Sequence, residues 1–306
     1  MKKLGKILLI VLGSIIGLVV LFLGSLNVIK FALYSEYYGI RDKVAVNPGL
    51  NEGAVPQGIA VDTKRDIIIT SAYMADKSAS RLYVTNSKNK SKYVELYYEN
   101  GKAFTGHVGG VSLSGDYVYI ANDDRIYKIS LDDVLTKSSI QLGESNSYKV
   151  NNQASFTFAD DEYLYVGEFH YGPYVCEHEI GDYHAICTKY DLDDLTTPVA
   201  IYSIRDKVQG FCVTDEGDIV LSTSWSLADS HFYVYDSENI VQNGTYQDVP
   251  LYILDNPSKV IKAPAMSEDL SYSDGKVYTM YENACNKYIF GKFFFASNKV
   301  VALDFE

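Results

Sequence analysis

Apolar and polar positions follow two different patterns in this chain, and the pattern changes near residue 34. Residues 7–29 form one run of 23 positions without a charged residue, whereas residues 35–306 contain short runs in which apolar and polar residues alternate. At about 1.5 Å per residue, a helix over residues 7–29 is long enough to cross a hydrocarbon layer of about 30 Å. We therefore expect a membrane segment within residues 1–34 and a folded domain over residues 35–306.

The flanks of the apolar run indicate how it sits in a membrane. Lys2, Lys3 and Lys6 precede it and Lys30 follows it. A secretory signal has a shorter apolar region and a small-x-small cleavage site, and neither feature is found here. We therefore favour an uncleaved anchor over a cleaved signal, held in the lipid bilayer through residues 7–29. The positive-inside rule places the N-terminus in the cytoplasm and residues 35–306 outside the cell, as in a single-pass cell-membrane protein.

The rest of the chain repeats one arrangement five times. Each repeat has a polar start, a short strand, a turn with Asp or Gly, and a second strand rich in Tyr, Ile and Val. These runs are β-branched and aromatic and are bounded by turn residues, as expected of strands. The paired first and second strands are predicted at 56–62 and 66–71, 107–114 and 116–122, 153–159 and 162–168, 209–214 and 218–224, and 267–273 and 276–282.

A third strand follows in each repeat and a fourth in four of them. Four antiparallel strands recurring roughly every fifty residues are typical of β-propeller blades. We therefore predict an all-β fold, a five-bladed β-propeller; six blades are the alternative if 35–50 and the long final segment contain further strands. The third strands are predicted at 81–85, 125–130, 188–192, 231–236 and 299–303, and the fourth at 93–97, 139–142, 199–204 and 249–253.

The fifth repeat ends the chain without a fourth strand. Residues 43–47, which read Lys-Val-Ala-Val-Asn, lie just before the first repeat. We expect this segment to supply the outer strand of the fifth blade, because joining both ends of the chain in one sheet closes the ring and removes its open edges. The alternative is that residues 35–50 are only a tether.

Residues 116–130 and 162–168 carry a family resemblance. Their Tyr-rich strand pairs resemble the extracytoplasmic bacterial propellers of the YVTN and NHL-like kind, over about residues 50–306. The resemblance implies blades but no single activity, because that grouping includes lactonases, dehydrogenases and binding modules. Three repeat starts are also similar to those of uncharacterised secreted and membrane-anchored proteins of Gram-positive bacteria: His-Val-Gly-Gly at 107–110, Val-Gln-Gly-Phe at 208–211 and Met-Ser-Glu-Asp at 266–269.

Composition and charge exclude several classes of protein. With 47% hydrophobic and 22% charged residues, the chain is neither disordered nor collagen-like. The net charge of the chain is −12, and residues 1–34 carry +4, which leaves −16 on the remainder. Binding to nucleic-acid phosphates needs an excess of Lys and Arg, so we expect no nucleic-acid partner.

The four cysteines match no zinc ribbon or thioredoxin-like motif. Cys176 and Cys187 bracket ten residues of polar character, which suggests a loop stapled by a disulfide in an oxidising compartment. Cys212 lies in an apolar strand pattern typical of a buried free thiol. The sequence leaves the pairing open.

The first strand of a propeller blade lines the central channel, whose mouth is a common place for ligands. The predicted first strands open with polar residues, and the second strands end in polar or acidic residues near aromatic ones, a mixture that suits sugars. The alternative is that these polar groups bond one another and plug the channel, while the aromatic side chains pack between blades. The candidate ligand-binding residues are Gln57, His107, Gln153, Ser155, Glu168, His170, Gln209, Trp225, Glu268 and Glu282.

Two enzymatic interpretations use the same positions. Glu168, Glu268 and Glu282 resemble the acids of five-bladed glycosidases, but Gln57 and Ser71 stand where that family has acids on its first blade. A metal-dependent lactonase or phosphatase would use His107 and Glu268 with Asn122. The histidines of the 170–187 loop suit a solvated lid better than a metal site. No Gly-x-Ser-x-Gly nucleophile motif or phosphate-binding glycine loop is present.

The sequence therefore predicts a membrane-anchored extracellular propeller that binds a small polar ligand, a glycan or a protein partner at the channel mouth. The alternative is a glycosidase- or lactonase-type hydrolase at the same place. No catalytic residue, metal site or cofactor is assigned.

Overall fold

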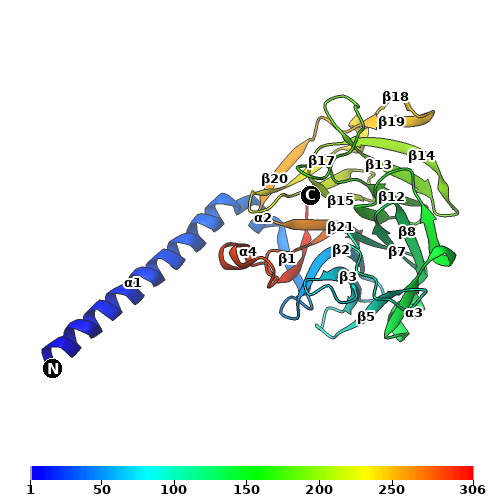
Figure 1. Ribbon diagram of the computed structural model, residues 1–306. Coiled ribbons are helices and arrows are strands. Elements are labelled where there is room, and N and C mark those ends of the chain that lie inside the picture. Colours follow the sequence, from blue (N-terminus) through cyan, green and yellow to red (C-terminus); the bar gives the residue numbers. More distant parts are fainter. Residues whose placement is uncertain (1, 306) are drawn as a thin grey trace.

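The computed structural model describes residues 2–305. Five sheets are arranged in a ring, and a long helix leaves the ring at one edge (Figure 1). The helix is α1 (Lys2–Leu33), followed by α2 (Ser35–Ile40). The segment Gly5–Leu33 is long and apolar enough to cross a membrane and is not buried by the propeller. By length and composition, it suits either a membrane anchor or a signal sequence.

The five sheets are the blades of a β-propeller, numbered here in chain order. Blade 1 contains β2 (Ala54–Asp62), β3 (Ile67–Met74), β4 (Arg81–Thr85), β5 (Ser91–Tyr98) and β9 (Ser139–Leu142). Blade 2 contains β6 (Gly110–Ser114), β7 (Tyr117–Asn122), β8 (Arg125–Ser130) and β10 (Ser147–Lys149). Blade 3 contains β11 (Phe156–Ala159), β12 (Tyr163–Gly167), β13 (Ala185–Asp191), β14 (Asp194–Ile204), β19 (Val249–Ile253) and β18 (Gln242–Tyr246).

Blade 4 contains β15 (Val208–Val213), β16 (Ile219–Thr223), β17 (Ser230–Tyr235) and β20 (Lys259–Ala263). Blade 5 contains β21 (Ser267–Ser273), β22 (Lys276–Tyr281), β23 (Lys299–Leu303) and β1 (Arg41–Val46). Short helices α3 (Leu131–Thr136) and α4 (Ile289–Phe294), with 3-10 turns at Glu144–Asn146 and Ser237–Asn239, lie in the connections. The predicted five blades, and the first three strands of each, are confirmed.

The ring closes through its two chain ends. Strand β1 pairs antiparallel with β23, with Ala45 opposite Val300 and Arg41 opposite Leu303. The expectation that residues 43–47 supply the outer strand of the fifth blade is therefore confirmed, and the tether alternative is wrong. The sheet gains a fourth strand that the C-terminal repeat does not itself contain.

Two predicted fourth strands belong to other blades. Strand β9, expected at the edge of blade 2, instead pairs in parallel with β5 of blade 1. Strand β19, expected in blade 4, pairs in parallel with β14 of blade 3. The outer strands of blades 2 and 4 are the shorter β10 and the later β20. A four- or five-residue alternating strand has the same pattern on any sheet edge, so the sequence does not show which edge it joins.

The hydrophobic core lies between neighbouring blades rather than in a single central mass. Ile59 and Ile68 of blade 1 pack against Met280 and Val300 of blade 5, and similar layers fill the other blade interfaces. Backbones approach closely at the axis: a Cβ on Gly110 would lie 2.3 Å from the Thr157 nitrogen. The central channel is therefore narrow at these strands.

Candidate functional site

The candidate residues all lie at one end of the ring, which we call the mouth. Inner strands begin there and second strands end there, because the two are antiparallel. The mouth does not hold one site, however. The structure separates the candidates into an acidic cluster on blades 5 and 1, a histidine–glutamate pair on blade 3, and an aromatic pocket between blades 3 and 4.

The acidic cluster consists of Gln57, Glu268, Asp269 and Glu282. Gln57 Nε2 donates to Glu282 Oε2 at 3.2 Å and to the Pro56 carbonyl at 2.8 Å, which orients its amide. Glu268 is 2% exposed, and its Oε1 has no hydrogen-bond partner among the described residues. Three acidic side chains, two from β21 and one that directly follows β22, therefore lie close together, and those of Glu268 and Asp269 are almost fully buried.

Burial and mutual repulsion keep protons on this cluster. Burial raises the pKa of Glu282 to about 7, against the opposing effects of Lys287, Gln57 and Tyr288. Burial, followed by the charges of Glu282 and Asp269, raises the pKa of Glu268 well above its ordinary value. Glu268 and Glu282 therefore titrate as a coupled pair, and this pair is at least partly protonated near neutral pH.

Asp269 acts as a plug on the axis. Its Oδ2 accepts hydrogen bonds from the Ile59 and Val111 backbone nitrogens, each at 3.3 Å, so one side chain joins inner strands of blades 5, 1 and 2. Burial raises its pKa well above the ordinary value in spite of these donors. This contact corresponds to the alternative to ligand binding, in which polar groups plug the channel.

A basic and aromatic rim lies above the acidic cluster. His107 stacks on Tyr73, with ring centroids 4.8 Å apart, and remains open to solvent on one side. Lys287 donates to the Tyr73 hydroxyl, which in turn lies 3.5 Å from the Tyr288 hydroxyl. Partial burial and the nearby Lys287 charge both lower the pKa of His107, which disfavours a cationic imidazole.

On blade 3, the carboxylate of Glu168 has several hydrogen-bond partners within the protein. Its Oε1 accepts from the Gln153 nitrogen and its Oε2 from the Ile186 nitrogen, both at 3.1 Å. His178 Nε2 lies 3.2 Å from Glu168 Oε2, and its Nδ1 lies 2.9 Å from the Tyr246 hydroxyl. With all these partners and 3% exposure, Glu168 fastens the 170–184 loop and the β18–β19 hairpin to the blade.

Four further candidates lie on blades 3 and 4, and two of them have local hydrogen bonds. Ser155 Oγ accepts from the Phe169 nitrogen at 3.2 Å, and His170 Nδ1 accepts from the Cys176 nitrogen at 2.9 Å. Gln153 is exposed and Gln209 is half-buried. These four residues lie at the mouth, but the structure does not bring them into one cluster with Glu268 and Glu282.

Trp225 belongs to the aromatic pocket. Its ring stacks on Phe169 at 5.9 Å and meets Tyr171 edge-on at 5.3 Å. The pocket has a volume of about 550 Å³. It is lined by Asp182, Tyr183, Arg205, Asp206, Lys207, Thr223, Ser224, Trp225, Ala228, Asp229, His231 and Tyr233.

Arg205 is held in place within this pocket. Its Nε donates to the Tyr235 hydroxyl at 3.0 Å, and its guanidinium lies 3.7 Å from the centroid of the Tyr233 ring. Lys207 lies 3.9 Å from the centroid of Tyr171. Asp206 Oδ1 is buried without a hydrogen-bond partner in the described structure. The wall therefore combines basic, acidic and aromatic side chains around the same space.

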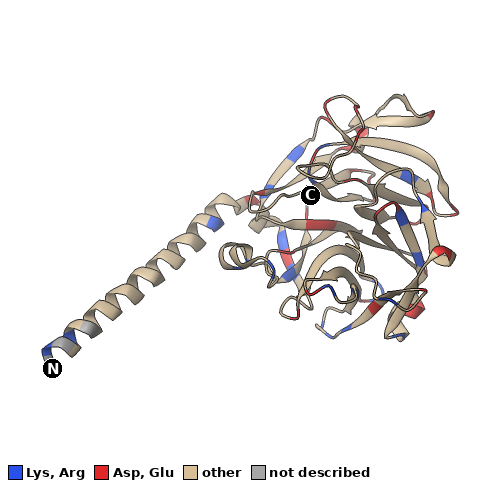
Figure 2. Ribbon diagram, in the orientation of Figure 1, with Lys and Arg blue, Asp and Glu red and all other residues tan. Residues whose placement is uncertain are grey.

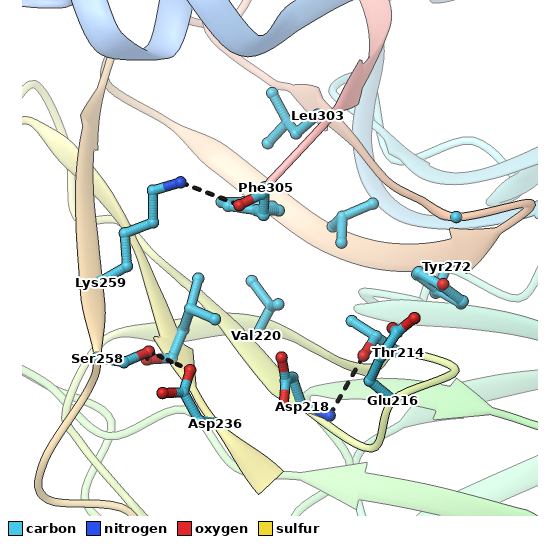
Figure 3. Close-up of a pocket in the computed structure, with 13 residues that line it drawn as sticks. Thr214, Glu216, Asp218, Val220, Asp236, Ser258, Lys259, Tyr272, Leu303 and Phe305 are labelled. Atoms are coloured by element: carbon cyan, nitrogen blue, oxygen red, sulfur yellow. Dashed lines mark hydrogen bonds between the residues drawn. The ribbon is translucent and has the colours of Figure 1, made fainter.

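A second pocket lies at the opposite end of blades 4 and 5. It has a volume of about 250 Å³. Its lining residues include Thr214, Asp218, Tyr272 and Phe305 (Figure 3). Lys259 Nζ donates to the Phe305 carbonyl across it, at 3.0 Å. None of the candidate residues lines this pocket.

The four cysteines are placed differently from the suggested staple. All four cysteines are free and buried, so the suggested staple between Cys176 and Cys187 is absent. Cys176 Sγ instead lies 3.5 Å from the Phe169 carbonyl, and Cys187 faces the core of blade 3. Within residues 2–305, no group of three or more His, Cys, Asp or Glu side chains is placed to hold a metal ion.

The sequence did not identify Lys287, Tyr288, Arg205 or Lys207 as part of these sites. All four lie in connections between strands, outside the repeated pattern that pointed to the mouth. Lys207 lies just before an inner strand in a domain with a large excess of acids. A basic residue at such a position is a sequence signal for a site residue at the mouth.

Comparisons with known proteins identify no family for this chain. No protein-family model matches the chain, and no curated protein matches it. The resemblance to YVTN and NHL-like propellers therefore stays a prediction. Among solved structures, the chain is similar to a thermostable family-43 glycoside hydrolase, with 10% identity and a TM-score of 0.44 over 85% of this chain and 91% of that one.

Two further solved structures are similar to the chain. The PQQ-bound aldose sugar dehydrogenase of Streptomyces coelicolor has 16% identity and a TM-score of 0.43, covering 79% of this chain and 77% of that one. Hydrazine synthase of Kuenenia stuttgartiensis has 10% identity and a TM-score of 0.42. That match covers 74% of this chain but only 55% of the synthase chain. Likenesses this weak carry no inference about activity.

Proposed function

We propose that this protein is a membrane-anchored extracellular propeller that binds a small polar ligand of the sugar class at the mouth. The observation that carries the proposal is the aromatic pocket between blades 3 and 4. Its volume of about 550 Å³ lies in the range of small-molecule sites, roughly 300–1,000 Å³. Trp225, a candidate from the sequence, forms part of its wall.

The chemistry of the pocket favours a ligand with several hydroxyl or amide groups. Trp225, Tyr183 and Tyr233 offer flat faces, which cover the apolar side of a sugar ring. Arg205 and Lys207 donate hydrogen bonds, whereas Asp206 and Asp229 accept them. Because both signs of charge line the space, a neutral or zwitterionic polar ligand fits better than a strongly charged one.

The helix α1 supports the membrane part of the proposal. Its uncharged stretch ends at Lys30, and Figure 2 shows basic residues at both ends of the helix with none between them. The lysines at the N-terminal end favour a cytoplasmic N-terminus. The propeller then lies outside the cell, attached through a single helix.

The competing function is a carboxylate-based hydrolase at the acidic cluster, and one observation favours it. Glu282 has a pKa of about 7, a value suited to a general acid. However, a glycosidase needs two carboxyl groups facing each other across open space. Glu268 is 2% exposed, and neither Glu268 nor Glu282 lines either pocket described above. We therefore rank this function second.

A thermal-shift screen of the full chain in detergent, against a panel of sugars and cell-wall fragments, tests the binding proposal. A ligand at 100 times its dissociation constant stabilises the fold by about 2.7 kcal/mol, which raises the melting temperature measurably. We expect Lys207→Gln and Trp225→Ala to abolish the shift. Tyr117→Ala, at an exposed aromatic residue on blade 2, should preserve it.

The outcomes separate the two functions. A shift that persists in Lys207→Gln and Trp225→Ala but disappears in Glu282→Gln would move the site to the acidic cluster and justify turnover assays. No shift with any member of the panel would contradict a sugar-class ligand.

A further inference from the structure

An exposed apolar surface lies on the connection between β22 and β23. Helix α4 and its flank read Ile-Phe-Gly-Lys-Phe-Phe-Phe over residues 289–295. Ile289 is 73% exposed, Phe290 68% and Phe293 58%, the first two being higher than any other large apolar side chain of the propeller. We call these three residues the α4 patch. Large contiguous apolar surface of this kind marks an interaction site.

The α4 patch points outward because the other side of α4 is fixed to the propeller. Gly291 is buried, and a Cβ there would lie 3.1 Å from Met266 Sδ and 3.2 Å from the Asn283 carbonyl oxygen. Lys292 Nζ donates to Asn51 Oδ1 at 2.9 Å and to Asn286 Oδ1 at 2.7 Å. The face of α4 that carries Gly291 therefore packs against the propeller. The large apolar side chains of the α4 patch are exposed to solvent.

The patch is next to the end of α1. Lys30 Nζ lies 5.7 Å from the centroid of the Phe295 ring, immediately after α4. Figure 1 shows α4 beside α2, where α1 joins the ring. On α1 itself, Phe31 is 65% exposed and Leu33 53%. Exposed apolar side chains therefore lie both at the end of α1 and on the neighbouring α4.

No flexible linker separates α1 from the propeller. Tyr34 N donates to the Lys30 carbonyl at 3.0 Å and Tyr38 N to the Tyr34 carbonyl at 2.9 Å, so helical hydrogen bonds continue across the junction. Tyr37 is fully buried and packs on Phe232 and Tyr281. The position of α4 relative to α1 is therefore fixed by the packing at this junction.

The charges around the patch differ from those of the domain as a whole. Lys287 and Lys292 lie in the same connection as the patch, and Lys30 contacts Phe295, in a chain whose net charge is −12. Aromatic side chains bordered by lysines are typical of segments that lie at a membrane interface, where the rings enter the headgroup region and the ammonium groups meet phosphate.

We infer that the α4 patch inserts into the interface of the same phospholipid bilayer that α1 spans. The propeller is then held at two points, and its mouth end is close to the membrane surface. Asp229 of the aromatic pocket accepts from Tyr34 Oη at 2.6 Å, so that pocket is beside the same surface. This inference rests on the proposed anchoring by α1.

Fluorescence quenching in vesicles tests the inference with the full chain. Because the four native cysteines are buried, an introduced surface cysteine takes a single thiol-reactive NBD label. We would label Phe293→Cys and, independently, Phe290→Cys in vesicles of phosphatidylcholine and phosphatidylglycerol. Val241→Cys, 61% exposed just before β18, is the matched control, and Leu18→Cys in α1 reports the anchor. Lipids with a nitroxide near the headgroup or deep in the acyl chain serve as quenchers.

The expected result is a blue-shifted NBD emission at positions 290 and 293, with quenching by the headgroup-level nitroxide severalfold stronger than at position 241. If position 18 is quenched by the deep nitroxide while 290 and 293 behave like 241, the inference fails and the anchor stands. If position 18 is also unquenched, the anchoring proposal fails with it. Blue-shifted but unquenched labels at 290 and 293 would mean that a second copy covers the patch, which also overturns the inference.

Discussion

Glu282 illustrates how a single residue acquires its properties from its surroundings. In sequence it is one of several acids at a strand end. In the structure it lies beside Glu268 and accepts a hydrogen bond from Gln57, and burial raises its pKa to about 7. Between the ordinary pKa of 4.5 and this value, the folded state keeps a proton that the unfolded state has lost. Stability must therefore fall as pH rises through that window.

We predict that Glu282→Gln weakens this pH dependence. The wild-type protein should lose stability between pH 5 and pH 8, with a contribution from Glu282 on the order of 3 kcal/mol, and the variant should lose clearly less. Chemical unfolding of the full chain in detergent at the two pH values measures the difference. Glu238→Gln, at an exposed glutamate, is the control and should retain the wild-type slope. Equal slopes in wild type and Glu282→Gln would contradict the assigned pKa.

The other candidate residues show why residue type is a limited guide. Glu168 and Glu268 are both nearly fully buried acids at the mouth. Glu168 is satisfied by two backbone nitrogens and His178, whereas Glu268 has an oxygen without a partner. The sequence predicts the same role for both, that of a ligand-binding acid at the mouth. The difference depends on which loops fold over each one.

At the scale of single elements, the inner strands are the most constrained. They approach each other at glycines near the axis, where Gly58 faces Val111 and Gly110 faces Thr157. These contacts are between backbones, which have little freedom to move apart without disturbing the whole ring. Glycine is required at these positions by close approach, since neither has a positive φ.

We predict that Gly110→Ala destabilises the propeller by about 1–3 kcal/mol or more, because the new Cβ would lie 2.3 Å from the Thr157 nitrogen. Gly39→Ala is the matched control. A Cβ at Gly39 in α2 meets nothing within 4 Å, so the same substitution should cost no stability there. Thermal unfolding followed by circular dichroism compares the two. An unchanged melting temperature in Gly110→Ala would mean that the axis is less tightly packed than described.

The outer strands are the least constrained elements, and there the sequence-based prediction failed. Strands β9 and β19 leave their own repeats and add in parallel to the neighbouring blade. Their residues alternate as an outer strand should, so the strands themselves were predicted correctly. Which exposed edge accepts them depends on connection length and on the path of the chain over the surface.

At the scale of the whole molecule, the closure of the ring joins the long apolar helix α1 to the C-terminal strand. Strand β1 follows α2 directly and pairs with β23, so the segment that leaves α1 also completes blade 5. Ala45 is buried against Ile59, Met280 and Val300, at the interface of blades 5 and 1. The position of α1 and the folding of blade 5 are therefore coupled.

We predict that Ala45→Asp opens the closure. A carboxylate buried without a partner in this apolar layer should cost about 3 kcal/mol or more, and the freed β23 edge should promote association. Val46→Asp places the same charge one residue later on the exposed side, where Val46 is 38% accessible, and should be tolerated. Unfolding and size-exclusion chromatography of both variants give the comparison. Equal behaviour of the two variants would show that β1 pairing contributes little.

The sequence by itself determined the features that depend on local periodicity. It gave the apolar helix, five repeats of alternating strands and the closing segment at 43–47, because strand alternation and a long uncharged run are readable residue by residue. It also placed the candidate residues at strand ends that share one end of the ring, since antiparallel neighbours alternate in direction.

Only the tertiary structure decided how those residues are grouped. It separated the acidic cluster from the aromatic pocket, left the cysteines unpaired and placed α4 beside the end of α1. These outcomes depend on contacts between residues far apart in the chain, such as Gln57 with Glu282 and Tyr34 with Asp229. Such contacts are set by the curvature of the ring and the paths of irregular loops, which have no periodic signal in the sequence.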